Sequence, residues 1–140
     1  MHEKDCLFCK IIRGEIPTHF KIYEDEETLA FLDIQPVNPG HVLVITKDHF
    51  ENLYTTPDET LCRVIMTVKK MAVAVKNGLG VDGINLAMNN ETESGQKVPH
   101  THIHIIPRTN NDGLTHWKQR DYVPGEAEEI AKKIKEELKN

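Results

Sequence analysis

Residues 100–106 read His-Thr-His-Ile-His-Ile-Ile, and the interpretation of the whole chain starts from this stretch. Successive side chains of a β-strand point to opposite faces, so His100, His102 and His104 should share one face. The intervening residues should then point into the core. A lone histidine is most often structural, but three imidazoles at a spacing of two residues indicate a functional site.

Two chemistries use such a row of histidines: metal ligation and nucleophilic catalysis. The loop before the strand, residues 95–99, reads Gly-Gln-Lys-Val-Pro, and its backbone N–H groups are suited to hold an anion. No carboxylate lies within the strand. The pattern therefore favours a histidine that attacks phosphorus, and a hydrolase with a metal on all three histidines is the alternative.

Composition places the chain among ordinary globular proteins. It has 140 residues, of which 39% are hydrophobic and 28% charged, so we expect a single domain over residues 1–140. A net charge of −5 argues against a nucleic-acid or membrane partner, since both select a basic surface. The sequence has no apolar run long enough for a membrane span or a signal peptide, and we expect a cytoplasmic protein.

The remaining patterns predict an α+β fold with roughly five strands. Strands are expected at residues 20–24, 28–33, 41–46, 84–89 and 100–106, the last stopped by Pro107. A long central helix should begin at a capping box, residues 56–59, and end at Gly78. Residues 127–138 have the spacing of a short C-terminal helix. Short turns between most strands predict a mostly antiparallel sheet with both helices packed on it.

The histidine row resembles the histidine triad (HIT) motif, in which three histidines alternate with apolar residues. Further similarity, in the expected order, lies at residues 6–12, 29–34 and 39–45, at Asn89 and at residues 95–96. The pattern is closer to the Hint-like branch, which includes purine nucleoside phosphoramidases, than to the diadenosine polyphosphate hydrolases. The resemblance implies a HIT-like fold and a homodimer, for which we expect an interface stripe of Val64, Val68, Met71 and Val75.

The resemblance also implies roles for individual residues. His102 is the expected nucleophile, which attacks the α-phosphorus of a purine nucleoside phosphoramidate or related conjugate and forms a covalent nucleotidyl-histidine. Expected phosphate contacts come from His104 and from the backbone amides of Gly95 and Gln96. His41 is expected to help shape the site, and Asn89 to lie near the phosphate and the ribose. Asp33 should bind the ribose hydroxyls, and the apolar walls of the base site are expected at Phe8, Ile11, Phe31 and Ile34. Lys97 stands where many Hint-like proteins have serine, near the leaving group.

Two other functions remain open at this point: a dinucleoside polyphosphate hydrolase, and a nucleotide-binding adaptor with vestigial turnover. A zinc site is also expected. The spacing Cys6-x-x-Cys9 is that of a metal half-site. Resemblance to the galactose-1-phosphate uridylyltransferase branch, and to some bacterial HIT proteins, implies that His49 and His100 complete a structural zinc site. The alternative is a pair of reduced thiols.

Overall fold

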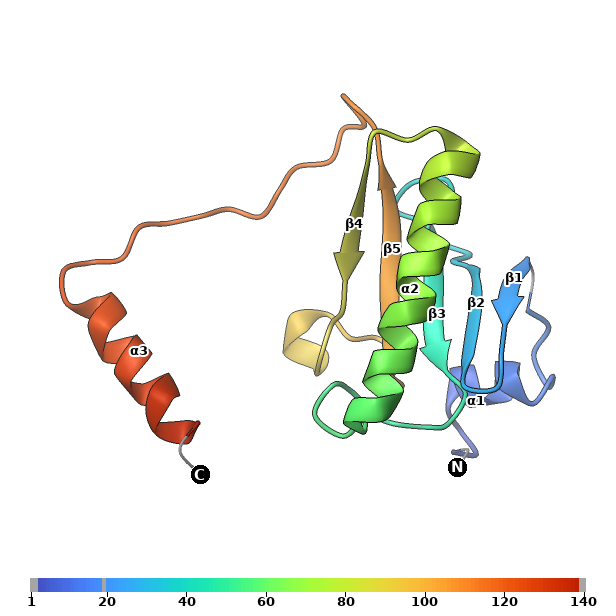
Figure 1. Cartoon of the computed structure of the whole chain (residues 1–140), viewed down its shortest axis with the longest axis horizontal. Coiled ribbons are helices and arrows are strands. Elements are labelled where there is room, and N and C mark those ends of the chain that lie inside the picture. Colours follow the sequence, from blue (N-terminus) through green and yellow to red (C-terminus); the bar gives the residue numbers. More distant parts are fainter. Residues whose placement is uncertain (1–2, 19, 139–140) are drawn as a thin grey trace.

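The computed structural model describes residues 3–18 and 20–138, and it confirms the predicted α+β fold (Figure 1). Five strands form one antiparallel sheet in the order β1-β2-β3-β5-β4. Their bounds are β1 Lys21–Glu24, β2 Thr28–Leu32, β3 Val42–Thr46, β4 Gly83–Ala87 and β5 His102–Arg108. The three helices are α1 Leu7–Ile12, α2 Asp58–Leu79 and α3 Glu126–Glu137, with a short 3-10 turn at Thr92–Ser94.

The β1–β2 hairpin turns within the acidic run at residues 24–27. The side chain of Asp25 accepts hydrogen bonds from the backbone N–H groups of Glu27 and Thr28 at 2.9 and 2.7 Å. Tyr23 donates its hydroxyl to the same carboxylate at 3.1 Å. The acidic cluster is therefore a turn, as the sequence indicates.

Each face of the sheet carries a separate layer of apolar side chains. On one face α2 buries Val64, Val68 and Met71 against Val44 and Ile105. On the other face α1 covers β2 and β3 with the buried residues Cys6, Phe8 and Cys9. The central strands are buried on both faces, which explains why their sequence is an apolar run rather than an alternating pattern.

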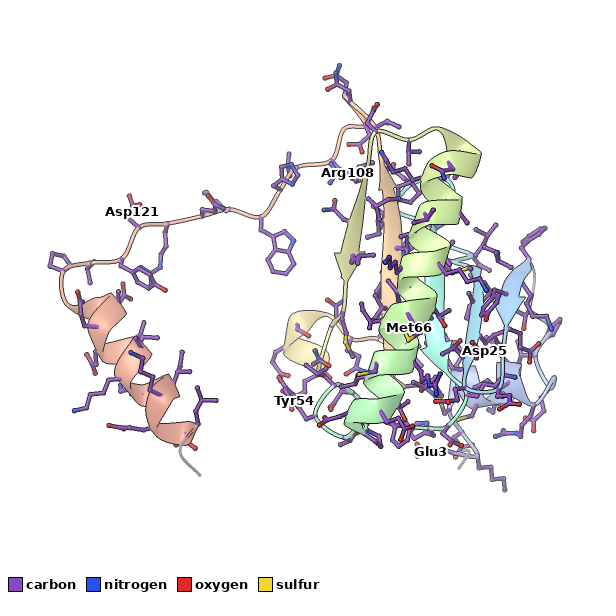
Figure 2. The ribbon with its side chains drawn as sticks, in the orientation of Figure 1. Glu3, Asp25, Tyr54, Met66, Arg108 and Asp121 are labelled. Carbon is purple, nitrogen blue, oxygen red and sulfur yellow. The ribbon has the colours of Figure 1, made fainter. Side chains whose placement is uncertain are left out.

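The burial of α2 corrects one expectation about the dimer. Val64, Val68 and Met71 lie in the core and cannot form an interface stripe. The outward surface of α2 instead exposes Ile65 and Met66, the latter labelled in Figure 2.

The two ends of α2 also differ from the prediction. Pro57 occupies the N-cap position and no side chain caps the helix. The hydroxyl of Thr56 lies 2.7 Å from the carbonyl of Asn52 and 2.7 Å from the hydroxyl of Thr101. The helix runs through Gly78 and ends before Gly80, whose φ of 63° is the left-handed conformation that glycine adopts readily at this position.

The last strand, β5, begins two residues later than predicted and continues through Pro107. Pro107 pairs with Ile84 of β4, beyond the last β3–β5 pair, Val42 with Ile105. Its carbonyl accepts a hydrogen bond from the side chain of Asn38 at 2.9 Å. The backbone N and C=O of a strand residue point to the same side of the strand. The nitrogen of Pro107, which has no hydrogen to donate, therefore faces the side where β3 no longer pairs with β5. Proline is tolerated in a strand at such an unpaired position.

The predicted C-terminal helix forms but does not pack on the sheet. In Figure 1, α3 stands apart from the sheet, connected to it by an extended segment, and α3 buries none of its residues. Trp117, Tyr122 and Val123 are exposed by 90%, 63% and 63%. Across the described residues, no helix combines the length and apolar character needed to cross a bilayer.

Candidate active site and metal site

The three histidines of the row share the α1 face of the sheet, as their alternation predicts. His102 lies opposite Ile45 and His104 opposite Leu43 on β3. The rings of His102 and His104 have centroids 5.0 Å apart. His100 lies two residues before the start of β5 and is fully buried. His100 is therefore separated from His102 and His104, which lie next to each other on β5.

A backbone contact determines which nitrogen of His102 carries the proton. Its Nδ1 lies 2.6 Å from the carbonyl oxygen of His100. A carbonyl only accepts, so Nδ1 carries the proton and donates it to this bond. The Nε2 lone pair of the neutral imidazole then remains available for nucleophilic attack.

A second chain of contacts determines the tautomers of His41 and His104. The backbone N–H of Val37 donates to Nδ1 of His41 at 3.1 Å, so the proton of His41 is on Nε2. That Nε2 lies 2.9 Å from Nδ1 of His104, which must accept. His104 therefore keeps its own proton on Nε2. The carboxylate of Asp33 lies 3.8 Å from Nε2 of His41.

Burial keeps these imidazoles neutral. Desolvation lowers the pKa of His102 and of His41 below 6.5, while the carboxylate of Asp33 acts in the opposite direction. Burial, together with repulsion from His102 and His41, lowers the pKa of His104 to about 4. The row thus presents an unprotonated nitrogen and an N–H donor side by side at neutral pH.

The loop before β5 is held in shape by its own side chains. Glu91 has φ 69°, which is uncommon for a residue other than glycine. The side chain of Gln96 accepts from the N–H of Glu91 at 2.7 Å and donates to the carbonyl of Glu51 at 2.7 Å. The N–H of Gly95 and that of Gln96 donate within the loop, to the carbonyls of Thr92 and Glu91. Both amides expected to bind phosphate are therefore already engaged in this structure.

The remaining nucleotide-site candidates fall into buried and open positions. Phe8 and Phe31 are buried, with their ring centroids 5.9 Å apart, and Phe8 also contacts the ring of His102 edge-on. Ile34 is 80% exposed. Ile11 is partly buried and packs against the core beneath α1. The side-chain amide of Asn89 lies beside Gly95. Lys97 is exposed at the end of the loop.

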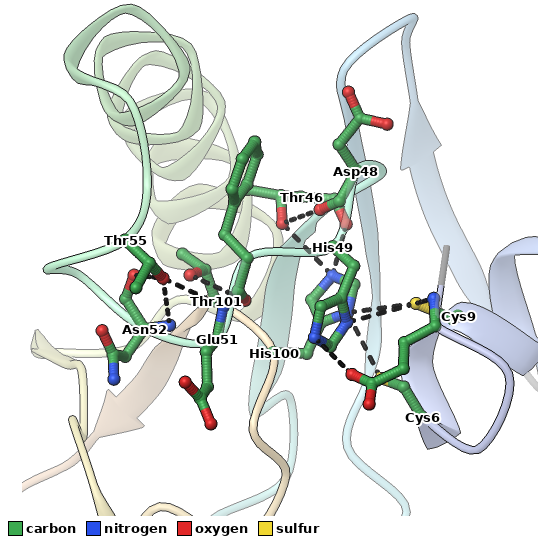
Figure 3. A network of polar contacts seen from close by, with 12 residues as sticks. Cys6, Cys9, Thr46, Asp48, His49, Glu51, Asn52, Thr55, His100 and Thr101 are labelled. Atoms are coloured by element: carbon green, nitrogen blue, oxygen red, sulfur yellow. Dashed lines mark hydrogen bonds and ion pairs between the residues drawn. The ribbon is translucent and has the colours of Figure 1, made fainter. Parts of the chain in front are cut away.

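The four predicted metal ligands come together beside the row (Figure 3). Donor atoms of Cys6, Cys9, His49 and His100 all lie within 4.8 Å of one another. The sulfur of Cys6 is 3.4 Å from Nδ1 of His100, and the sulfur of Cys9 is 3.4 Å from Nδ1 of His49. Tetrahedral zinc with ordinary bond lengths separates a sulfur and a nitrogen ligand by about 3.5 Å. The spacing therefore suits zinc, and it also suits thiol–imidazole hydrogen bonds.

The tautomers of both histidine ligands favour a metal between them. Nε2 of His100 lies 2.7 Å from the carbonyl of Thr46, and Nε2 of His49 lies 2.8 Å from a carboxylate oxygen of Glu3. Each Nε2 therefore carries a proton, and each Nδ1 lone pair faces the thiols. Glu3 was not anticipated from the sequence, because no spacing rule links it to a histidine 46 residues away.

A second group of possible ligands, Asp33, His41 and His104, also lies within 4.8 Å. Here the tautomers are unsuitable, because Nε2 of His41 carries the proton that bonds to His104. The alternative of one metal on the whole histidine row meets a different objection. Nδ1 of His100 faces the cysteine sulfurs and its Nε2 bonds to the carbonyl of Thr46, so neither nitrogen of His100 is available to a metal shared with His102 and His104.

Comparison with known proteins assigns the family. The model of the HIT domain matches residues 13–111. This chain belongs to the HIT domain family. The adenosine 5′-monophosphoramidase HNT1 of Candida albicans is 40% identical over 95% of this chain and 91% of its own length. The similarity confirms the Hint-like branch and identifies the chain as a HIT-family hydrolase.

Solved structures of HIT proteins have the same fold. A crystal structure of a HIT family member from Bacillus subtilis is 44% identical, with a TM-score of 0.86 over 95% of this chain and 96% of that one. A histidine triad protein from Mycobacterium smegmatis is 41% identical, with a TM-score of 0.75 over 84% of each chain, and is described as Zn-bound.

Proposed function

We propose that this HIT hydrolase cleaves purine nucleoside phosphoramidates or related nucleotide conjugates at the α-phosphorus, with His102 as the nucleophile. The observation that supports this most directly is the bond from Nδ1 of His102 to the carbonyl of His100 at 2.6 Å. It leaves Nε2 unprotonated in a buried position, which is the state a nucleophilic imidazole requires. The similarity to an adenosine 5′-monophosphoramidase supports the same substrate class.

In the proposed reaction, a bond forms between Nε2 of His102 and phosphorus as the bond to the leaving group breaks. The leaving group takes up a proton from solvent. Water then attacks phosphorus, the bond from Nε2 of His102 to phosphorus breaks, and the nucleoside monophosphate leaves as the proton of the attacking water returns to solvent. The Nε2–H of His104, directed by the chain from Val37 through His41, donates to a phosphoryl oxygen as charge develops. Asn89 is a second donor beside the loop, and Gly95 and Gln96 contribute when phosphate displaces their internal bonds.

We assign the ribose hydroxyls to Asp33 and the purine to the apolar surface around Ile34. Asp33 accepts a bond from the N–H of Gln35 at 2.8 Å, which orients the carboxylate while its second oxygen faces His41. Ile34 presents exposed apolar surface next to it. Phe8 and Phe31 act beneath the site, as support for the histidine row. We assign Lys97 to the leaving group.

The test is His102→Ala, with His116→Ala as the matched control on an exposed histidine. Adenosine phosphoramidate and diadenosine polyphosphates are assayed side by side. Loss of His102 should abolish turnover, while nucleotide binding and the fold persist. Near-normal turnover in His102→Ala would disprove the mechanism. Faster cleavage of the diadenosine substrates would favour a polyphosphate hydrolase, and binding without turnover in the wild type would favour an adaptor.

We also propose that Cys6, Cys9, His49 and His100 hold one structural zinc ion. Support comes from two buried thiols, two imidazoles with lone pairs turned toward them, and a similar protein described as Zn-bound. Four protein ligands leave no open position, so the ion would tie α1 to the start of β5 without taking part in the reaction. Buried thiols paired in this way are typical of a reducing compartment, and we place the protein in the cytoplasm.

Metal analysis of reduced protein should find about one zinc per chain. Cys9→Ser should lower the melting temperature, and the same change at the exposed Cys62 should not. Protein prepared without chelators that contains no zinc would leave Cys6 and Cys9 as ordinary thiols bonded to the two imidazoles.

We further propose that residues 1–140 act as one domain within a homodimer. Support comes from apolar side chains that the single chain leaves exposed: Ile65 and Met66 on α2, Leu86 on β4, and Trp117 and Ile134 toward the C-terminus. A second copy of the chain would cover them.

A further inference from the structure

We propose that Glu3 is a positioning residue of the cysteine–histidine site and sets how tightly the chain retains zinc. The inference rests on the proposed zinc site. Its starting point is a pair of contacts from this one residue. The carboxylate of Glu3 lies 2.8 Å from Nε2 of His49, and its backbone N–H donates to the sulfur of Cys9 at 3.3 Å. Glu3 thus touches two of the four candidate ligands.

The two histidine ligands are oriented by different kinds of partner. His100 bonds through Nε2 to the carbonyl of Thr46, at the end of a buried strand. His49 bonds through Nε2 to the side chain of Glu3, which is 61% exposed. A carboxylate on the remote nitrogen of a histidine ligand holds the tautomer and the ring orientation, and makes the ligating nitrogen more basic. One ligand is therefore positioned by the main chain and the other by a side chain that can be replaced.

The segment that carries Glu3 is anchored to the end of α1. Arg13 donates to the carbonyls of Glu3 and Lys4, each at 3.3 Å. The same guanidinium is held by Glu15 at 2.6 Å. Figure 2 shows Glu3 beside the end of the sheet where the first helix lies. These anchors bring both the carboxylate and the N–H of Glu3 to the ligands without burying the residue, so its replacement should leave the core intact.

The experiment measures zinc affinity of the full-length protein by competition with a chromogenic chelator. The variants are Glu3→Ala and Glu3→Gln, with Glu26→Ala and Glu26→Gln as matched controls on an exposed glutamate of the turn between β1 and β2. Glu3→Ala should weaken zinc binding roughly 10- to 100-fold. Glu3→Gln should weaken it less, because the amide oxygen can still accept from His49. The Glu26 variants should bind zinc like the wild type.

Cobalt substitution and the stability of the metal-free protein separate positioning from other roles. The thiolate-to-cobalt absorption should persist in Glu3→Ala, since all four ligands remain. The free energy of unfolding of metal-free Glu3→Ala should match that of metal-free Glu26→Ala. Equal zinc affinity in Glu3→Ala and the wild type would overturn the role of Glu3 and leave the zinc site standing. A wild-type chain that binds no zinc would overturn both.

Discussion

At the scale of single residues, the contacts that keep the histidine row neutral also make the fold sensitive to acid. His104 has a pKa of about 4 in the folded chain, against 6.5 for an unperturbed imidazole. Well above pH 6.5 it is neutral in both the folded and the unfolded chain, and its titration does not affect stability. Below pH 6.5 the unfolded chain binds a proton that the folded chain excludes, so the free energy of unfolding falls until the pH reaches about 4.

We expect His104 alone to account for a loss of about 1–1.5 kcal/mol between pH 6.5 and pH 5. The lowered pKa values of His102 and His41 act in the same direction. Urea unfolding at a series of pH values measures the loss. His104→Asn keeps the four proposed metal ligands but has no imidazole at this position. Between pH 6.5 and pH 5 its free energy of unfolding should therefore fall less than that of the wild type, by the amount that His104 contributes. Parallel curves for the two proteins would contradict this prediction.

At the scale of elements, two glycines at the ends of α2 and β3 should respond to alanine with opposite sign. Gly40, just before β3, has φ 91°, and a Cβ there would collide with the side chain of Leu79. Gly40→Ala should therefore lower the free energy of unfolding by about 1–3 kcal/mol. Gly78 lies inside α2, where an added Cβ would meet no neighbouring atom, so Gly78→Ala should raise stability by about 0.5–1 kcal/mol.

Thermal or urea unfolding of the two variants beside the wild type tests the pair. Both variants replace glycine with alanine, so any difference in stability between them comes from the position of the substitution. Stabilisation by Gly40→Ala would mean that the turn before β3 relaxes to a negative φ. Destabilisation by Gly78→Ala would place a packing partner against that face of α2.

At the scale of the whole molecule, the C-terminal segment contributes little to the folded body of the single chain. Within the part of the chain that the structure describes, the last hydrogen bonds from this segment to the sheet region are those of Leu114 with Arg108 and Asp112. Truncation after Thr115 should therefore leave the circular dichroism of the sheet and α2 in place. It should also weaken the proposed homodimer, because it removes the exposed Trp117 and Ile134. Sedimentation of the truncated and full-length chains measures the dimer, and equal dimer stability would exclude the segment from the interface.

Much of the architecture could be predicted because it depends on local geometry. A period of two in residues 100–106 and a helical period in α2 were enough to predict the strand, its histidine face and the apolar stripe of the helix. From the sequence we expect that stripe at a dimer interface, whereas the structure buries most of it in the core. The errors lie where tertiary partners decide: Pro107 stays in β5 because β3 has already ended there, and Thr56 bonds to Thr101 instead of capping α2. The helix passes through Gly78 because Gly80 supplies the left-handed turn.

The sequence by itself determined that His100, His102 and His104 share a face, since strand geometry alternates side chains whatever the partners. It also contained the cysteine pair and the glycine-containing loop. Only the tertiary structure decided which nitrogen of His49, His100 and His104 carries the proton. Their hydrogen-bond partners are Glu3, Thr46 and His41, and the last pair is 63 residues apart. A hydrogen bond fixes a tautomer only when folding brings the partner group within reach, and no local pattern specifies contacts at that separation.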